Sequence, residues 1–265
     1  MKRLFIFAMA MAAAVGGVRA QCIDHTLWQG IMAANVDEEG LVDYDAIRAG
    51  RGGNIGQYLS LLGSAQLGTC GEAEKLAFWI NAYNANMIKK ILDRPKLKKV
   101  SEDFKIFDEK FKVAGQNLSL NEIENRVIRA DPAKGGPIPG VSLSHFDSRV
   151  HFALVCGAIS CPRLIGRAYR ADDLEKQLQA NAIHFANAPK HVRVEKGVLV
   201  LSTLLNWYKG DFDKVGGVKN FLISLIDSSK RADAAEVIES LKNGYPGKVK
   251  YEYDWTLNSI KNKRK

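Results

Sequence analysis

The sequence predicts an α+β protein with one domain, in which a buried central helix packs on a small, mainly antiparallel sheet. Helical segments and hairpins follow one another in irregular order, whereas a doubly wound sheet would alternate strands with helices. Residues 76–92 are apolar on nearly every side, which is typical of a helix in the protein interior. The dipeptide Lys196-Gly197 separates two runs that read as the strands of a hairpin.

The composition is that of an ordinary folded protein. The chain has 265 residues, of which 46% are hydrophobic and 25% are charged. These values exclude disordered, collagen-like and coiled-coil proteins. The sequence contains no internal repeat and no linker. We therefore expect one continuous domain over residues 21–258, followed by a basic tail at residues 259–265.

Residues 1–20 have the pattern of a signal peptide. Lys2 and Arg3 precede fifteen residues without a charge, and Val18 and Ala20 form a small-x-small pattern that suits cleavage by signal peptidase. Fifteen residues fall short of the roughly twenty that a membrane-spanning helix needs, although a retained N-terminal anchor stays an alternative. We expect a periplasmic or secreted protein, without a transmembrane segment once residues 1–20 are removed.

The charge pattern argues against nucleic acid as a partner. Cleavage after residue 20 removes three basic residues and lowers the formal net charge from +9 to +6. The remaining charges alternate in sign along most segments, and no basic stripe carries interleaved aromatic residues. Nucleic-acid binding is therefore not expected.

The N-terminal half is predicted to be mainly helical. Asp24 can cap a first helix. The pattern Thr69-x-x-Glu72 reads as a capping box ahead of the long apolar helix, which ends before Pro95. Residues 104–120 alternate around a glycine, as the two strands of a hairpin do.

A second capping box, Ser119-x-x-Glu122, predicts the start of another helix. After a loop rich in proline and glycine, residues 150–155 form a compact apolar run that predicts a strand. The remaining expected elements are a helix over residues 172–186, a hairpin of strands 191–195 and 198–202, helices over 218–226 and 234–242, and a strand over 249–253.

Amide side chains lie in the middle of the long apolar helix, where asparagine is a poor helix former. Asn81 and Asn84 are three residues apart and share a face, so one polar network can include both. A buried amide needs partners, because leaving it unpaired costs roughly 1–3 kcal/mol. Two interpretations stay open: a structural network that ties the helix to a neighbouring loop, or a polar pocket lined by the amides.

The stretch from His151 to Pro162 carries the reactive groups of the chain. In an extended strand His151 and Cys156 point to opposite faces, and the following loop can return Cys161 to either face. Three interpretations compete: a small-loop disulfide between Cys156 and Cys161, a thiol nucleophile activated by His151, or a switchable redox pair. No second metal-spaced pair accompanies the two cysteines, so no metal and no other cofactor is expected.

Glu124 is the one unassigned acid in the helix that starts at Ser119. Glu122 is accounted for as the capping-box partner, whereas Glu124 follows the core-facing Ile123. Its side chain either projects into solvent or enters a pocket, where it would orient His151. The aromatic run at residues 253–258 lies near the chain end, so it must dock against the core to be ordered.

Six blocks in the same order resemble the family of domain of unknown function 547 (DUF547). They are NVDEEGLVDYDAI from Asn35, LAFWINAYNA, LSLNEIENRVIR, RVHFALVCGAISCPRL, WYKGDF from Trp207 and YDWTLN, and they extend from about residue 35 to residue 258. Members of this family are often exported bacterial proteins, and no activity is established for the family. The resemblance therefore implies an exported bacterial protein.

The family pattern singles out a subset of the residues discussed above. It includes Glu124, His151, Cys156, the Asn81-x-Tyr83-Asn84 group and the Ser160-Cys161-Pro162 turn. It does not include Cys22 or Cys70. The resemblance therefore implies that Cys22 and Cys70 form a disulfide that is not part of the family pattern. Cys156 and Cys161, beside His151, are then left for function or structure.

The predicted layout is also similar to transglutaminase-like and papain-like cysteine enzymes, at the level of the fold alone. The expected activity is thiol-dependent hydrolysis or acyl transfer on a peptide or cell-envelope substrate. Cys161 or Cys156 would attack, His151 would act as the base and Glu124 would orient it.

In that mechanism Asn81 or Asn84, beside Tyr83, would contact the substrate or an oxyanion. The alternative is a non-catalytic binding module of the cell envelope with a structural cysteine pair. A Cys156–Cys161 bond, or a His151 sealed in the core, would argue against the enzyme.

Overall fold

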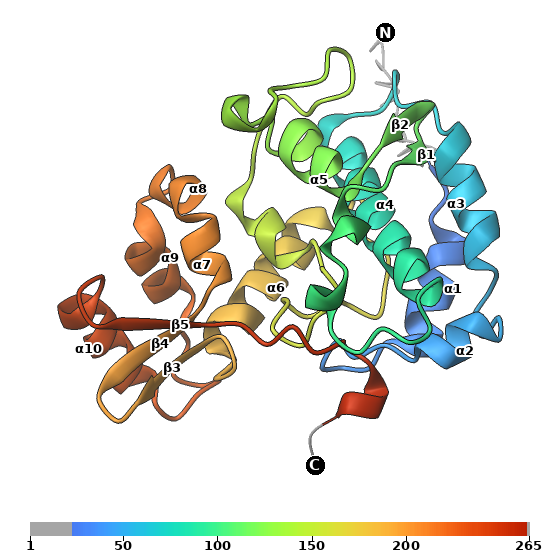
Figure 1. Ribbon diagram of the computed structural model, residues 1–265. Helices are drawn as coiled ribbons and strands as arrows, with labels where there is room; N and C mark the ends of the chain where they lie inside the picture. Colours follow the sequence, from blue (N-terminus) through green and yellow to red (C-terminus); the bar gives the residue numbers. More distant parts are fainter. Residues whose placement is uncertain (1–22, 264–265) are drawn as a thin grey trace, which may run out of the picture.

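The computed structural model describes residues 23–263, in which helices dominate and the strands are short (Figure 1). The helices are α1 (Thr26–Asn35), α2 (Tyr44–Arg48), α3 (Ile55–Ser64), α4 (Glu72–Leu92), α5 (Leu120–Glu122), α6 (Leu174–Asn187), α7 (Leu204–Trp207), α8 (Lys209–Asp213), α9 (Gly217–Leu225) and α10 (Ala234–Gly244). The strands are β1 (Phe111–Val113), β2 (Gln116–Leu118), β3 (Val192–Glu195), β4 (Val198–Ser202) and β5 (Val249–Glu252). The predicted α+β class is confirmed. Within the described residues, no helix combines the length and the hydrophobicity that crossing a membrane requires.

Helix α4 is the buried central helix that the sequence predicts, and it ends before Pro95 as expected. Its start differs from the prediction, because the helix begins at Glu72 and Thr69 lies too far upstream to cap it. The backbone N–H of Gly71 instead donates to the carboxylate of Glu74 at 2.7 Å. Two glutamates in the first turn stabilise the helix, because their negative charges lie near the positive end of the helix dipole.

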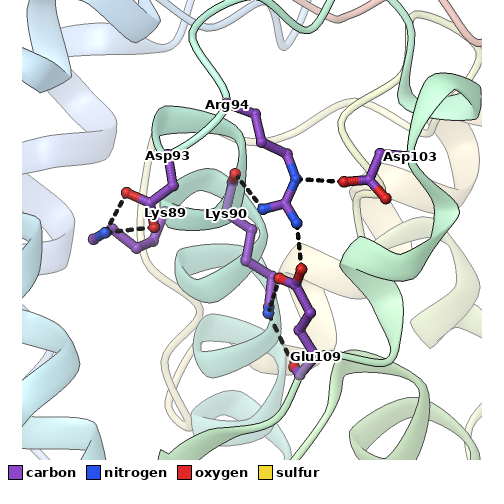
Figure 2. A network of polar contacts seen from close by, with 6 residues as sticks. All are labelled: Lys89, Lys90, Asp93, Arg94, Asp103 and Glu109. Atoms are coloured by element: carbon purple, nitrogen blue, oxygen red, sulfur yellow. Dashed lines mark hydrogen bonds and ion pairs between the residues drawn. The ribbon is translucent and has the colours of Figure 1, made fainter.

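A polar network secures the opposite end of α4 (Figure 2). Lys90 donates to the carbonyl oxygen of Glu109 at 2.9 Å and to its carboxylate at 3.1 Å. Arg94 donates to Asp103 at 2.8 Å and also pairs with Glu109. The network holds the segment between α4 and β1 against the helix end.

The core consists of two hydrophobic clusters, which correspond to the two sides of the molecule in Figure 1. The larger cluster surrounds α4 and takes in α1, α3 and the C-terminal aromatic run. The smaller cluster joins α6, β4, α9 and α10. The three-stranded sheet is covered by α10, whereas α4 packs mainly on other helices. In this respect the arrangement differs from the expected packing of the central helix on the sheet.

Both predicted hairpins form, but the first is shorter than the expected residues 104–120, because Phe104–Phe107 is a 3-10 helix. Strands β1 and β2 pair antiparallel around Ala114 and Gly115, and β3 and β4 pair antiparallel with Val192 opposite Leu201. Strand β5 then joins β4 in parallel, with Leu199 opposite Val249. The second capping box is also present, since Ser119 accepts from the N–H of Glu122 at 3.1 Å. The helix that follows widens into a π-helical turn, Ile123–Ile128.

The predicted strand at residues 150–155 is wrong. The chain forms a 3-10 helix, Ser148–Phe152, that Asp147 caps by accepting from the N–H of Arg149 at 2.9 Å. Within residues 23–263, no strand pairs with residues 153–155. The side chain of Asn84 takes that place, because its amide donates to the carbonyl of Ala153 at 2.9 Å and accepts from the N–H of Val155 at 2.9 Å.

The C-terminal segment crosses from β5 to the far side of the molecule (Figure 1). Single β-bridges attach it to three distant segments: Thr256 to Lys99, Leu257 to Ala158 and Ser259 to Val42. The expected docking of the aromatic run at residues 253–258 is thereby confirmed. The crossing brings Tyr253 and Trp255 beside the loop that carries the two cysteines.

Candidate functional site

A cleft of about 260 Å³ gathers most of the residues that the sequence singled out. Helix α4, the π-helical turn, the 3-10 helix, α7 and the C-terminal segment all contribute to its wall. The residues that line it are Tyr83, Phe104, Phe107, Asn121, Glu124, His151, Leu154, Cys156, Cys161, Pro162, Leu204, Trp207, Tyr208, Tyr253 and Trp255.

Cys156 and Cys161 form a disulfide bond in the wall of this cleft, with 6.2 Å between their Cα atoms. Gly157 makes the sharp turn after Cys156, with φ of +80°. A Cβ atom at Gly157 would lie 2.5 Å from Cδ1 of Ile91 on α4, so the loop also needs a residue without a side chain there. Of the three interpretations of this pair, the structure contains the small-loop disulfide. The other expected bond involves Cys22, which lies outside the described residues.

The two sulfur atoms differ in their surroundings. Sγ of Cys161 accepts from the backbone N–H of Cys156 at 3.1 Å and of Ala158 at 3.3 Å. The hydroxyl of Tyr253 lies 3.0 Å from Sγ of Cys156 and 3.3 Å from Sγ of Cys161. Cys161 is 2% exposed, whereas Cys156 is partly exposed. Two backbone N–H groups therefore point at the more buried sulfur, whereas the single hydroxyl of Tyr253 is shared and lies nearer Cys156.

His151 is held by Asp211, a residue that the sequence reasoning missed. Nε2 of His151 lies 3.0 Å from Oδ2 of Asp211. The same carboxylate accepts from Nε of Arg129 at 2.7 Å, and its other oxygen accepts from Lys214 at 3.0 Å. Burial alone would raise the pKa of Asp211, but the hydrogen bonds from His151, Arg129 and Lys214 outweigh it and lower the pKa well below its usual range.

The anionic Asp211 determines which ring nitrogen of His151 carries the hydrogen. Because the carboxylate only accepts, Nε2 of His151 carries the hydrogen in the neutral ring. Burial is the largest influence on the pKa of His151 and lowers it, so the ring is neutral at pH 7. Among the residues that the structure describes, none forms a hydrogen bond with Nδ1. The ring lines the cleft, so Nδ1 is the nitrogen left to accept a proton there.

Glu124 enters the cleft and does not project into solvent. The side chain comes from the π-helical turn and is 7% exposed as a residue. It accepts a hydrogen bond from the hydroxyl of Tyr208, whose ring stacks on His151 with 3.7 Å between centroids. Glu124 therefore reaches His151 through Tyr208, whereas the direct partner of the imidazole is Asp211. Asp211 lies in the block WYKGDF, which was the available sequence signal for it.

The two asparagines of α4 serve the fold and do not line the cleft. Asn81 donates to the carbonyl of Tyr169 at 2.8 Å and accepts from its N–H at 2.9 Å. Asn84 makes the paired contacts with residues 153 and 155 described above. Tyr83 lies between them and does reach the cleft, where burial and then the charge of Glu124 raise its pKa. The structural interpretation of the amides is the one that the contacts support.

Aromatic rings form the outer part of the cleft. Tyr253 lies 4.7 Å from Trp207 and 4.5 Å from Trp255, measured between ring centroids, and Phe104 lies 5.0 Å from Trp255. Trp207 is 47% exposed and Phe104 is 49% exposed. The sequence indicated the C-terminal run and the block that begins at Trp207, but not that they meet, because the two segments are far apart along the chain.

The comparison with known families agrees with the resemblance and covers a shorter region. A family described as "Protein of unknown function, DUF547" matches residues 67–186. The matched region contains Glu124, His151 and both cysteines, whereas Asp211 and the C-terminal aromatic run lie beyond it. No curated protein and no solved structure matches the chain.

Proposed function

We propose that this protein is a binding module whose cleft captures a cationic group of a peptide or another cell-envelope ligand; the family that matches residues 67–186, DUF547, is one of unknown function. The observation that carries this proposal is the pairing of one buried carboxylate, Glu124, with a wall of aromatic rings. In the oxidised protein neither Cys156 nor Cys161 is a thiolate, so binding is the function that the cleft can perform in this state.

The charge of the cleft supports a cationic ligand. Glu124 is the only lining residue with a formal charge at pH 7, because burial keeps His151 neutral. The nearby guanidinium of Arg129 is occupied by Asp211 and Asp131. The chain as a whole carries +9, so the acidic character of this cleft is local and opposite to the net charge.

The aromatic wall supports the same ligand. A cation over the face of Trp or Tyr gains about 0.5–2 kcal/mol, depending on how far it is desolvated. Trp207, Tyr253 and Trp255 lie within stacking distance of one another on the way to Glu124. A volume of about 260 Å³ is below that of a site for a whole drug-sized molecule. The cleft therefore suits one basic side chain or one terminal amine.

Replacement of Glu124 tests the proposal. A tripeptide with one lysine and an acetylated N-terminus is expected to quench the tryptophan fluorescence of the oxidised protein, and the form that is also acetylated at Nε is expected to bind at least about tenfold more weakly, because that acetylation removes the only positive charge. Glu124→Gln is expected to lose the same factor, since a hydrogen bond to a charged group contributes roughly 1.5–3 kcal/mol. The measurement is titration by fluorescence and calorimetry.

Glu236→Gln is the matched control, because Glu236 is exposed on α10 and outside the cleft. Its affinity for the tripeptide is expected to equal that of the unchanged protein. Equal affinity of the Glu124 variant, or equal binding of the acetylated peptide, would contradict the cationic ligand.

A second function, thiol-dependent hydrolysis or acyl transfer, is supported by the His151–Asp211 pair. Cys156 or Cys161 would attack, and Nδ1 of His151 would accept the proton. Glu124 would act through Tyr208, and no oxyanion donor is assigned to Asn81 or Asn84, whose amides are occupied. The Cys156–Cys161 bond and the burial of His151, whose side chain is 1% exposed, argue against this function in the oxidised protein, so the activity is expected only after reduction. The test compares hydrolysis of peptide and ester substrates before and after reduction, with free thiols counted by alkylation and mass. Equal activity in both states, or none after reduction, would exclude it.

A further inference from the structure

We infer that the Cys156–Cys161 disulfide is a thiol–disulfide exchange site, in which the thiolate of a partner dithiol attacks Cys156 and Cys161 leaves. This chemistry does not depend on cation binding, although it takes place in the same cleft. It rests on the position of the bond, on the unequal exposure of its two sulfurs and on the donors around one of them.

The position of the bond gives it access to a partner. A purely structural disulfide is commonly buried between elements, whereas this bond forms part of the wall of an open cleft. Cys156 is partly exposed and Cys161 is 2% exposed. An attacking sulfur must approach along the S–S axis from the side of the atom that it attacks, so the accessible target is Cys156.

The surroundings of Cys161 make it the better leaving group. A disulfide exchanges faster when the departing sulfur is stabilised as a thiolate. The backbone N–H groups of Cys156 and Ala158 already point at Sγ of Cys161, at 3.1 and 3.3 Å, and the hydroxyl of Tyr253 lies 3.3 Å away. Hydrogen bonds to an ionised acceptor are about twice as strong as neutral ones. The two backbone contacts therefore strengthen as negative charge develops on Cys161, and the hydroxyl of Tyr253, which lies nearer Cys156, can turn its one hydrogen towards the departing sulfur.

The cleft also holds an acceptor for the proton of the incoming thiol. His151 is neutral, and its Nδ1 has no partner among the described residues. The carboxylate of Glu124 faces the same space and disfavours the entry of an already ionised thiol. The partner is therefore expected to enter as a thiol and to lose its proton inside the cleft.

The exchange balances in two steps. The partner thiol gives its proton to His151 and its sulfur bonds to Sγ of Cys156, while the Cys156–Cys161 bond breaks and its electron pair leaves on Cys161 as a thiolate. The second thiol of the partner, as a thiolate, then attacks the mixed disulfide and releases Cys156. The two departing thiolates take up two protons. One dithiol becomes a disulfide, and this protein becomes a dithiol.

The aromatic wall indicates the chemistry of the partner. Trp207, Trp255 and Phe104 line the same cleft as Cys156, and their rings favour apolar or aromatic residues. The partner is therefore a peptide or protein with two cysteines next to apolar residues.

Trapping of the mixed disulfide tests the site of attack. The native oxidised protein is incubated with glutathione, quenched with an alkylating agent, and digested with trypsin. Residues 150–163 form one tryptic peptide that contains both cysteines, so tandem mass spectrometry separates the two sites from Cys22 and Cys70. Glutathione is expected on Cys156. Glutathione on Cys161, or no reduction of this pair by millimolar dithiothreitol without denaturant, would overturn the inference.

A variant at Tyr253 tests the leaving group. Tyr253→Phe keeps the ring and removes the hydroxyl near both sulfurs, so reduction by dithiothreitol is expected to slow several-fold. In Cys156→Ser, the Cys161 thiolate absorbance is expected to titrate at lower pH than that of Cys156 in Cys161→Ser. Tyr58→Phe is the control, because its hydroxyl contacts His25 at 2.7 Å and Tyr58 does not line the cleft. An unchanged rate in Tyr253→Phe, or the opposite order of titration, would contradict the assignment. The trapping experiment on the unchanged protein decides the question if a variant does not fold.

Discussion

Single side chains in this protein satisfy backbone groups that regular structure would otherwise pair. Asn84 binds both the carbonyl of Ala153 and the N–H of Val155, as an adjacent strand would. Buried polar groups must have partners, and here one amide provides two. At this scale the sequence predicted which residues matter, since buried asparagines in an apolar helix demand an explanation. Their role could not be predicted, because the partners are backbone atoms some 70 residues away, which no sequence pattern identifies.

Replacement of Asn84 is expected to lower the free energy of unfolding. In Asn84→Leu the carbonyl of Ala153 and the N–H of Val155 stay buried without partners, which costs about 1–3 kcal/mol for each group. Urea denaturation measures the loss. Asn86→Ala is the matched control on the same helix, because Asn86 binds only the carbonyl of Ala82 in its own helix. A loss for Asn84→Leu no larger than for Asn86→Ala would show that the paired contacts contribute little.

Secondary-structure elements follow local chemistry wherever that chemistry suffices. Helix α4, the capping box at Ser119, both hairpins and the later helices lie where their patterns predict. The strand expected at residues 150–155 failed for a physical reason. An apolar run predicts burial equally well in a strand, a 3-10 helix or a loop, and a strand also needs a neighbour for its ladder. Here the carboxylate of Asp147 accepts from the N–H of Arg149, and the amide of Asn84 donates to the carbonyl of Ala153, so these backbone groups have partners without a neighbouring strand.

At the scale of the whole molecule, the fold buries several histidines. His191 is fully buried, stacks on Phe185 at 4.1 Å, and neither of its ring nitrogens has a partner among the described residues. Burial lowers the pKa of His191 well below its usual value. Burial likewise lowers the pKa of His25 and of His184 to about 4. The folded state therefore holds these rings neutral.

Stability is expected to fall as pH falls from about 6.5 towards 4. The unfolded chain binds protons on these histidines near pH 6.5, the ordinary pKa of histidine, whereas the folded chain binds them only near pH 4 or below. Their contribution is thus fully present above pH 6.5 and is lost with acidification. Urea midpoints at pH 7, 6, 5 and 4 measure the loss.

His191→Leu serves as the matched variant, because it removes one of the titrating groups and fills a similar volume. Its stability is expected to decline less between pH 6.5 and 4 than that of the unchanged protein. A parallel decline in both proteins would assign the pH dependence to other groups.

The sequence alone was enough to predict the α+β class and the central helix, because helix periodicity, capping and hairpin turns are local properties. It was also enough to identify Glu124, His151 and the two cysteines as chemically unusual. Tertiary structure alone decided their relations. Asp211 became the partner of His151, Glu124 was directed to Tyr208, and Tyr253 was brought from the C-terminal segment to the disulfide. These contacts join residues some 60 to 100 positions apart, and only the packing of the two core clusters and the crossing of the last segment places them in one cleft.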